Sequence, residues 1–208
     1  MNIREKSQSM DFGSEIHNYA KRILNKEPFF CDEKIKPFVE NTIILIEKIK
    51  EKYPLIEKVE YPFSYPLKDL GFDSDLQFSG RIDAIFRNED EYLIVDWKSN
   101  KSYENNSEYR QQLEAYKKVY SLKEKIPYEK IKVALGYVGL RTAINTGKID
   151  YYLDERQPQK TAFETLSKKI NVILSWINNV DLFFEDFIKT KEDNFLWKSI
   201  VEEIKKEK

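Results

Sequence analysis

Residues 80–99, GRIDAIFRNEDEYLIVDWKS, contain two apolar segments separated by a short polar one. Both apolar segments are rich in β-branched and aromatic residues, and a polar, acidic interval between such segments is typical of a turn. The stretch therefore predicts a β-hairpin with Glu89 and Asp90 at its tip. In this register, Asn88 faces Glu91 across the turn.

Side chains alternate along a strand, so the same register divides the hairpin into two faces. One face is apolar and is expected to lie in the core; it consists of Ile82, Ala84, Phe86, Leu93, Val95 and Trp97. The other face carries Arg81, Asp83, Asp96 and Lys98. Asp83 faces Asp96 directly, and directly opposed residues have Cβ atoms about 5 Å apart. The register therefore predicts two neighbouring acidic side chains, with a lysine two residues further along one strand.

Two adjacent carboxylates destabilise a sheet unless their charge is compensated. A divalent cation provides such compensation, and hard oxygen ligands favour Mg²⁺ or Mn²⁺ over softer metals. The alternative interpretation is a solvated surface cluster of Asp83, Asp96 and Lys98. The hairpin geometry alone leaves both interpretations open.

The segments around the hairpin predict helices and further strands. Helical spacing of apolar residues occurs after a cap at Asp11 or Ser14, over about 33–50, over about 107–120 and over about 157–206. Extended segments occupy 59–67, where two prolines indicate an edge strand, 131–140 and 148–154. The fold class is therefore α/β, with a central mixed β-sheet flanked by helices and helical additions at both ends.

The apolar residues of these helices are the expected packing residues. They are Ile16, Ala20, Ile23 and Leu24 in the first helix, Phe38, Ile43, Leu45, Ile46 and Ile49 in the second, and Trp176, Phe183, Phe184, Phe187, Leu196 and Trp197 in the last. We expect a single domain over residues 1–208, because the 208 residues are enough for one full core and short for two.

Composition limits the remaining function classes. Cys31 is the only cysteine, which excludes an intramolecular disulfide and an iron–sulfur cluster held by this chain. No apolar run reaches the roughly 20 residues that span a bilayer, and the N-terminus lacks the apolar stretch of a secretory signal. We therefore expect a cytoplasmic, intracellular protein without a membrane partner. The net charge of −1 means that any nucleic-acid site must be a local patch.

Four short motifs occur in a fixed order between Gly13 and Tyr116. They are GSEIHNYAKRIL at 13–24, GRIDAI at 80–85, YLIVDWKSNK at 92–101, and the Q-x-x-x-Y pattern of Gln112 and Tyr116. This order resembles the PD-(D/E)xK nuclease superfamily, in which one strand supplies an Asp and the next supplies D-x-K. The upstream histidine and the Q-x-x-x-Y helix resemble its RecB-like branch. Ile82 stands where the superfamily pattern has proline.

The resemblance implies a restriction-endonuclease-like core and a bound Mg²⁺ or Mn²⁺ ion. Its ligands would be the side chains of His17, Asp83 and Asp96 and the backbone carbonyl of Trp97. Taken alone, His17 has a simpler interpretation, since a single histidine beside apolar helix residues is more often a boundary residue of the core.

The resemblance also implies roles for three further side chains. Lys98 would orient the attacking water or stabilise the transition state, while Gln112 and Tyr116 would position the scissile phosphate. The predicted DNA phosphate contacts are Arg81, Lys101 and Arg110. Taken alone, Tyr116 belongs to an apolar helix stripe with Tyr109, Leu113 and Tyr120, which needs no functional explanation.

The resulting prediction is a metal-dependent DNA nuclease that prefers single-stranded DNA and acts in replication, recombination or repair. The chain lacks a phosphate-binding G-x-x-x-x-G-K-[ST] loop, so a helicase motor would have to come from a partner. A homo-oligomer is equally compatible with the sequence. The alternatives are a junction-resolvase-like nuclease, a catalytically inactive nuclease fold that binds DNA or acts as a scaffold subunit, and an unrelated α/β protein with a coincidental motif order.

Overall fold

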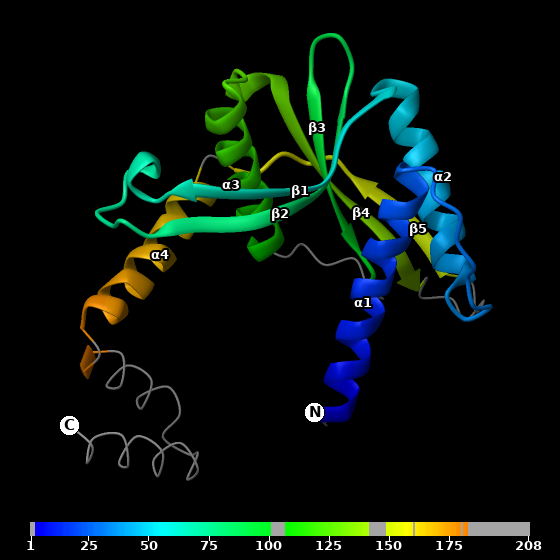
Figure 1. The fold of residues 1–208 in the computed structure, drawn as a ribbon, viewed down its shortest axis with the longest axis horizontal. Coiled ribbons are helices and arrows are strands. Elements are labelled where there is room, and N and C mark those ends of the chain that lie inside the picture. The colour runs from blue at the N-terminus through cyan, green and yellow to red at the C-terminus, as the bar shows by residue number, and fades with distance from the viewer. Residues whose placement is uncertain (1–2, 101–106, 142–148, 160, 180, 183–208) are drawn as a thin grey trace.

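A five-stranded sheet forms the centre of the computed structural model, and helices pack on both of its faces (Figure 1). The structure describes residues 3–100, 107–141, 149–159, 161–179 and 181–182. The strands are β1 (Leu55–Pro66), β2 (Gln77–Arg87), β3 (Tyr92–Lys98), β4 (Ile131–Arg141) and β5 (Ile149–Asp154). The helices are α1 (Ile3–Leu24), α2 (Lys36–Lys52), α3 (Ser107–Glu124) and α4 (Ala162–Asn178), with 3₁₀ turns at Lys68–Leu70 and Tyr128–Lys130. The α/β prediction is confirmed.

The strands lie side by side in sequence order, from β1 at one edge to β5 at the other. Every pair is antiparallel except β3 and β4, which are parallel. A parallel pair needs a long crossover connection, and α3 lies within it. The sheet is therefore mixed, and β1 is an edge strand, as its prolines predicted.

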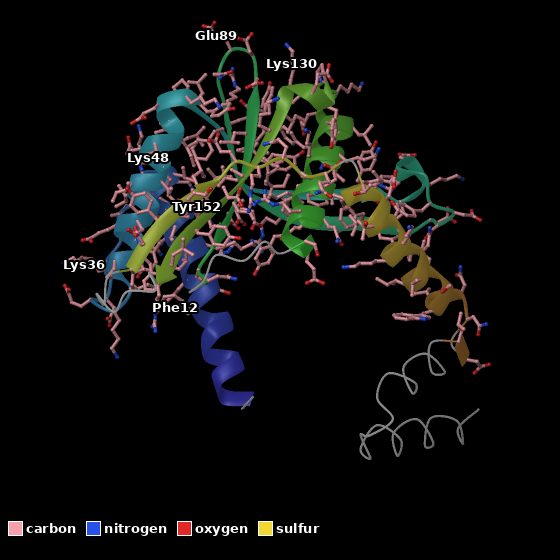
Figure 2. All side chains as sticks on the ribbon, turned by 180° about the vertical axis from the view of Figure 1, so that it is seen from behind. Phe12, Lys36, Lys48, Glu89, Lys130 and Tyr152 are labelled. Carbon is pink, nitrogen blue, oxygen red and sulfur yellow. The ribbon has the colours of Figure 1, made fainter. Side chains whose placement is uncertain are left out.

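The hairpin of β2 and β3 has the predicted register. Ala84 pairs with Val95, and Arg87 pairs with Tyr92. In the turn, the N–H of Asn88 donates to the carbonyl of Glu91 at 3.0 Å. Figure 2 shows Glu89 at the tip of this hairpin. The side-chain parity that places Asp96 and Lys98 on one face of β3 is therefore correct.

The core consists of two layers, one on each face of the sheet. The first layer packs α1 and α2 against Ala84, Phe86, Leu93, Val95, Trp97, Ala134 and Val138. The second packs α3, with Leu174 of α4, against Ile82, Ile85, Ile94, Ile131, Val133, Leu135 and Tyr137. Trp97 is 1% exposed, so its predicted place in the core is confirmed.

The prediction that Ile82 shares a face with Ala84 is wrong. In the ladder between β1 and β2, Val59 pairs with Ala84 and contacts the first layer, whereas Tyr61 pairs with Ile82 and contacts the second. Between them lies Glu60, whose φ of 50° is outside the extended region. The strand alternation is therefore interrupted at Glu60, directly beside the position of Asp83.

Two further helix predictions need correction. The first helix already begins at Ile3, so neither Asp11 nor Ser14 is its cap. Ile43 of α2 is 39% exposed and is not a core residue, whereas Thr42 beside it is fully buried.

Among the described helices, none is both long and apolar enough to cross a membrane.

The last predicted helix begins later than expected. Helix α4 starts at Ala162, because the side chain of Gln157 bonds instead to the backbone N–H and carbonyl of Val133, at 3.2 and 3.1 Å. Pro158 follows directly and does not continue a helix. The expected packing residues from Phe183 to Trp197 lie outside the described part of the chain. The single-domain boundary at residues 1–208 stays a prediction.

Candidate metal and catalytic site

Asp83 lies where the described pairing of β2 with β3 ends, and its carboxylate joins two other elements. One oxygen, Oδ2, accepts a hydrogen bond from the backbone N–H of Trp97 at 2.9 Å. The other, Oδ1, lies 3.1 Å from Nδ1 of His17 on α1. The side chain of Asp83 is 11% exposed and that of His17 is 35% exposed. The helix and the hairpin thus bring His17 next to Asp83, as the motif order predicted.

Asp96 and Lys98 form the second half of the site. Both project from β3 toward the second core layer, and Lys98 Nζ lies 2.6 Å from Asp96 Oδ2. Asp96 is 3% exposed, so its carboxylate is removed from water. Although the two charges are close, Oδ2 of Asp96 accepts no hydrogen bond of acceptable geometry from the described residues. A buried carboxylate oxygen with unused lone pairs is a suitable ligand for a hard cation.

The electrostatics of the site correspond to an excess of negative charge. Burial and the neighbouring charge of Asp83 raise the pKa of Asp96 to about 6, even though Lys98 acts in the opposite direction. Burial alone would lower the pKa of His17, but the hydrogen bond and the charge of Asp83 outweigh it and raise that pKa. Both shifts favour the protonated forms, and the negative charge of Asp83 contributes to each of them.

Lys98 is held by a chain of contacts from α3. Its Nζ lies 3.4 Å from Oε1 of Gln112 and 4.2 Å from the ring centre of Tyr109. Gln112 in turn donates from Nε2 to the hydroxyl of Tyr116 at 2.7 Å. Gln112 and Tyr116 therefore lie on one helix face, with Gln112 directed at the lysine. In this structure, the contacts of the Q-x-x-x-Y pair orient Lys98.

A glycine on β4 makes room for the D-W-K segment. Gly136 pairs with Trp97 across the parallel ladder. A Cβ atom at position 136 would lie 2.4 Å from the Trp97 indole ring, which is far inside van der Waals contact. Gly136 therefore allows the indole to pack in the core, so that Asp96 and Lys98 on either side of it face α3.

Glu60 on β1 is a site residue that the sequence did not predict. Its carboxylate, a nitrogen of His17 and a carboxylate oxygen of Asp83 all lie within 4.8 Å of one another. The left-handed backbone at Glu60 accompanies this placement, and nothing in the pattern VEYPF predicts it. The only available signal was an acidic residue in an edge strand beside the Asp83 strand.

The donor set fits a hard divalent cation. His17, Glu60 and Asp83 supply one nitrogen and two carboxylates, and Asp96 lies close enough for its charge to raise the pKa of His17. Oxygen-rich sets of this kind suit Mg²⁺ or Mn²⁺ better than softer metals. Trp97 is close through its N–H, while its backbone carbonyl stays a predicted ligand.

A pocket of about 630 Å³ opens beside these donors. It is lined by Gly13, Ser14, His17, Asn18, Lys21, Glu60, Arg81 and Asp83. Arg81 Nη1 lies 3.0 Å from Glu60 Oε2, and its side chain is 65% exposed. Of the three predicted phosphate contacts, Arg81 therefore lies at the site.

The other two predicted phosphate contacts have different positions. Arg110 forms an ion pair with buried Asp154 and lines a separate pocket of about 410 Å³ near the starts of α3 and α4. Lys101 lies outside the described residues. The roles of Arg110 and Lys101 in DNA binding stay predictions, and Arg110 has a structural partner that competes for its charge.

Comparison with known proteins identifies the family. The family model for the PD-(D/E)XK nuclease superfamily matches residues 2–191. A search of curated proteins found no match to the chain. Among solved structures, the crystal structure of SSO0001 aligns at 17% identity with a TM-score of 0.35, over 68% of this chain and 61% of its own. This last similarity is too low to support any conclusion. The family model covers most of the chain, and the protein belongs to the PD-(D/E)XK nuclease superfamily.

Proposed function

We propose that the protein is a metal-dependent deoxyribonuclease of the RecB-like branch that prefers single-stranded DNA. The observation that carries the proposal is the convergence of His17, Asp83, Asp96 and Lys98, from three elements, around a buried excess of negative charge. Inactive relatives need neither a D-x-K triplet nor a compensating cation. The upstream histidine and the Q-x-x-x-Y contact to Lys98 support the RecB-like assignment.

His17, Asp83, Asp96 and Glu60 would hold one or two Mg²⁺ or Mn²⁺ ions, together with the carbonyl of Trp97. When bound, such an ion acidifies a water molecule and stabilises charge on the phosphorus. Asp83 keeps His17 oriented through their 3.1 Å contact, and the Trp97 N–H fixes the other Asp83 oxygen. The chain thereby sets the direction of its ligands before any substrate binds.

Lys98 is the candidate for stabilising the developing charge on the phosphate. Its ammonium is held by Asp96 and Gln112 and by the face of Tyr109, so it is fixed in one orientation at the edge of the buried carboxylates. Preorganised charges of this kind lower the barrier because no reorientation is needed during the reaction. Arg81, and Lys21 across the same pocket, would bind neighbouring backbone phosphates.

Single-stranded DNA is the proposed substrate, and replication, recombination or repair is the proposed setting. Base-independent binding needs a basic groove and few sequence-reading groups, which agrees with a pocket that carries Lys21 and Arg81. A helicase partner would supply the strand separation that this chain has no motif for, and a homo-oligomer is the alternative assembly.

The test incubates end-labelled single- and double-stranded DNA with the protein and Mg²⁺, Mn²⁺ or EDTA. The Asp96→Asn variant should lose cleavage, while Asp90→Asn, the same change at the exposed tip of the same hairpin, should retain it. Circular substrates then separate endonuclease from exonuclease action. Retention of DNA in a shift assay without cleavage under any condition would overturn the proposal in favour of a binding subunit.

A further inference from the structure

The carboxylate of Glu60 has two competing sets of neighbours. On one side it lies with His17 and Asp83 in the group of candidate metal ligands. On the other, its Oε2 is 3.0 Å from Nη1 of Arg81. The Glu60 side chain is only 19% exposed, so solvent screens neither interaction fully.

Among the described residues, the Asp83 and Glu60 carboxylates each lie against a nitrogen-bearing side chain. His17 lies against Asp83, and Arg81 lies against Glu60. Arg81, and His17 when it is protonated, offset the repulsion between these two neighbouring carboxylates. A divalent cation between the carboxylates would take over this compensation, and it would weaken the hold of Glu60 on the arginine.

Once released from Glu60, Arg81 would lie where it can bind a phosphate. Its side chain is 65% exposed and lines the same pocket as Lys21 and Asp83. A guanidinium binds a phosphate through two parallel hydrogen bonds, which a pairing with Glu60 would obstruct. The same residue pair therefore connects the metal position with the surface where a DNA backbone would lie.

We propose that Glu60 is a metal ligand whose capture by the cation releases Arg81 to bind a DNA phosphate, so that metal and DNA bind cooperatively. The inference rests on the proposed nuclease function and names a coupling within its site. It gives Glu60 a role in binding metal and Arg81 a role that depends on the state of Glu60. By linkage, DNA must strengthen metal binding by the same factor by which metal strengthens DNA binding.

The two strands offer a matched control pair. Glu57 and Arg87 also join β1 to β2, with Arg87 Nε 2.7 Å from Glu57 Oε2. Glu57 is not among the described candidate metal ligands, and Arg87 does not line the pocket beside Asp83. Removing a charge from this pair tests the general effect of charge on the same strands.

Calorimetry on the full chain measures Ca²⁺ affinity, first alone and then with a saturating short oligo-deoxythymidine whose integrity is checked on a gel. Oligo-deoxythymidine should raise the Ca²⁺ affinity of the wild-type protein at least about fivefold. Glu60→Gln should weaken Ca²⁺ binding about tenfold and Arg81→Gln should strengthen it, because Arg81 no longer competes for Glu60. In the Glu60→Gln background, Arg81→Gln should change Ca²⁺ affinity less than twofold.

Arg81→Gln should also reduce the effect of oligo-deoxythymidine on Ca²⁺ affinity, whereas Arg87→Gln should leave it at the wild-type value. The inference is overturned if Glu60→Gln binds Ca²⁺ like the wild type, or if Arg81→Gln and Arg87→Gln change Ca²⁺ affinity equally. Asp83→Asn separates the two proposals. Loss of Ca²⁺ binding in Asp83→Asn but not in Glu60→Gln refutes only this inference. A wild-type protein that binds no Ca²⁺, Mg²⁺ or Mn²⁺ refutes the proposed function as well.

Discussion

Two buried aspartates lie on either side of Leu135, on the two strands that neighbour β4, and they differ in how far their negative charge is compensated. Leu135 pairs with Asp96 of β3 on one side and with Asp154 of β5 on the other. Asp96 is 3% exposed and Asp154 is fully buried. The two carboxylates thus occupy the same row of the same sheet, and differences between them arise from their partners.

Asp154 is compensated in excess. Arg110 and Arg156 both form ion pairs with it, and Arg156 adds a hydrogen bond from Nε at 3.0 Å. Both oxygens are hydrogen-bonded, one of them also by the backbone N–H of Arg156 at 3.1 Å. Two guanidinium partners use most of the hydrogen-bonding capacity of a buried carboxylate, which leaves little for a ligand.

Asp96 has the opposite balance. Its described cationic contact is Lys98, and the charge of Asp83 opposes it. Its Oδ2 lacks a well-oriented hydrogen bond. Burial alone therefore does not identify a functional carboxylate. Asp96 is the candidate because its negative charge is only partly compensated, which would allow a cation to bind there.

The largest loss of stability is expected when the Asp154 carboxylate is neutralised. Asp154→Asn leaves two arginines facing a neutral amide, and breaking a buried pair typically costs about 3 to 5 kcal/mol of unfolding free energy. We expect urea denaturation to show a loss in this range, with unchanged cleavage per folded molecule. A loss of cleavage without a loss of stability would mean that Asp154 belongs to the active site.

Neutralising the Asp96 carboxylate should have the opposite effect on stability. Asp96→Asn removes a carboxylate that repels Asp83, so the metal-free variant should be more stable than the wild type by roughly 1 to 3 kcal/mol at pH 7. The same change removes a proposed metal ligand and should lower metal-dependent cleavage at least about 100-fold. Denaturation in EDTA and a cleavage assay measure the two effects. A destabilised variant would contradict the excess negative charge.

The stability difference between Asp96→Asn and the wild type should depend on pH. Burial and Asp83 raise the pKa of Asp96 to about 6, above the value of about 3.9 expected in the unfolded chain. A raised pKa means that protonated Asp96 stabilises the fold below about pH 4, and that this contribution is lost as the pH rises through 6. In EDTA, the stability advantage of Asp96→Asn should therefore be small at pH 4 and should grow to its full value above pH 6.

Saturating Mg²⁺ or Mn²⁺ should reverse this pH dependence of the stability difference between Asp96→Asn and the wild type. The cation favours the ionised form of Asp96 and the neutral form of His17, whose pKa is raised by Asp83 in its absence. Metal affinity should therefore fall as the pH drops through the pKa of about 6 for Asp96 and through the raised pKa of His17, because both groups then take up protons. A stability difference that is independent of pH in EDTA would contradict the raised pKa of Asp96.

The sequence predicted one of the two aspartate environments and not the other. The alternation of apolar residues around Glu89 and Asp90 determined the hairpin register, and the register brought Asp83 toward Asp96. The helix spacing of Gln112 and Tyr116 placed both on one face. These features depend on local periodicity, which a single sequence contains.

The remaining features depend on contacts that are distant along the chain. The partner of Asp154, Arg110, lies 44 residues away on another element, and no local pattern links them. Glu60 reaches the site through a left-handed backbone that interrupts β1, and a propensity for φ > 0 at glutamate cannot be predicted. For the same reason, the sequence placed Ile82 in the wrong core layer.

The smallest effects are expected on removing one supporting side chain near each aspartate. Gln112→Ala deletes the 3.4 Å contact that holds Lys98 over the site, and we expect kcat to fall about tenfold with little change in unfolding free energy. Arg156→Ala removes the half-exposed partner of Asp154 but keeps Arg110, and it should cost about 1 kcal/mol of stability with kcat unchanged.

Steady-state kinetics and thermal denaturation test whether Gln112→Ala lowers kcat and Arg156→Ala lowers stability. A hydrogen bond that orients the proposed catalytic lysine should act in the transition state, whereas an ion pair at the far strand should act only on folding. Ca²⁺ affinity should stay at the wild-type value in both variants, because neither side chain is a proposed metal ligand. If Gln112→Ala instead lowers stability as much as Arg156→Ala and leaves kcat intact, then the Q-x-x-x-Y pair serves the core of α3. In that case Lys98 would be positioned by Asp96 and Tyr109 without it.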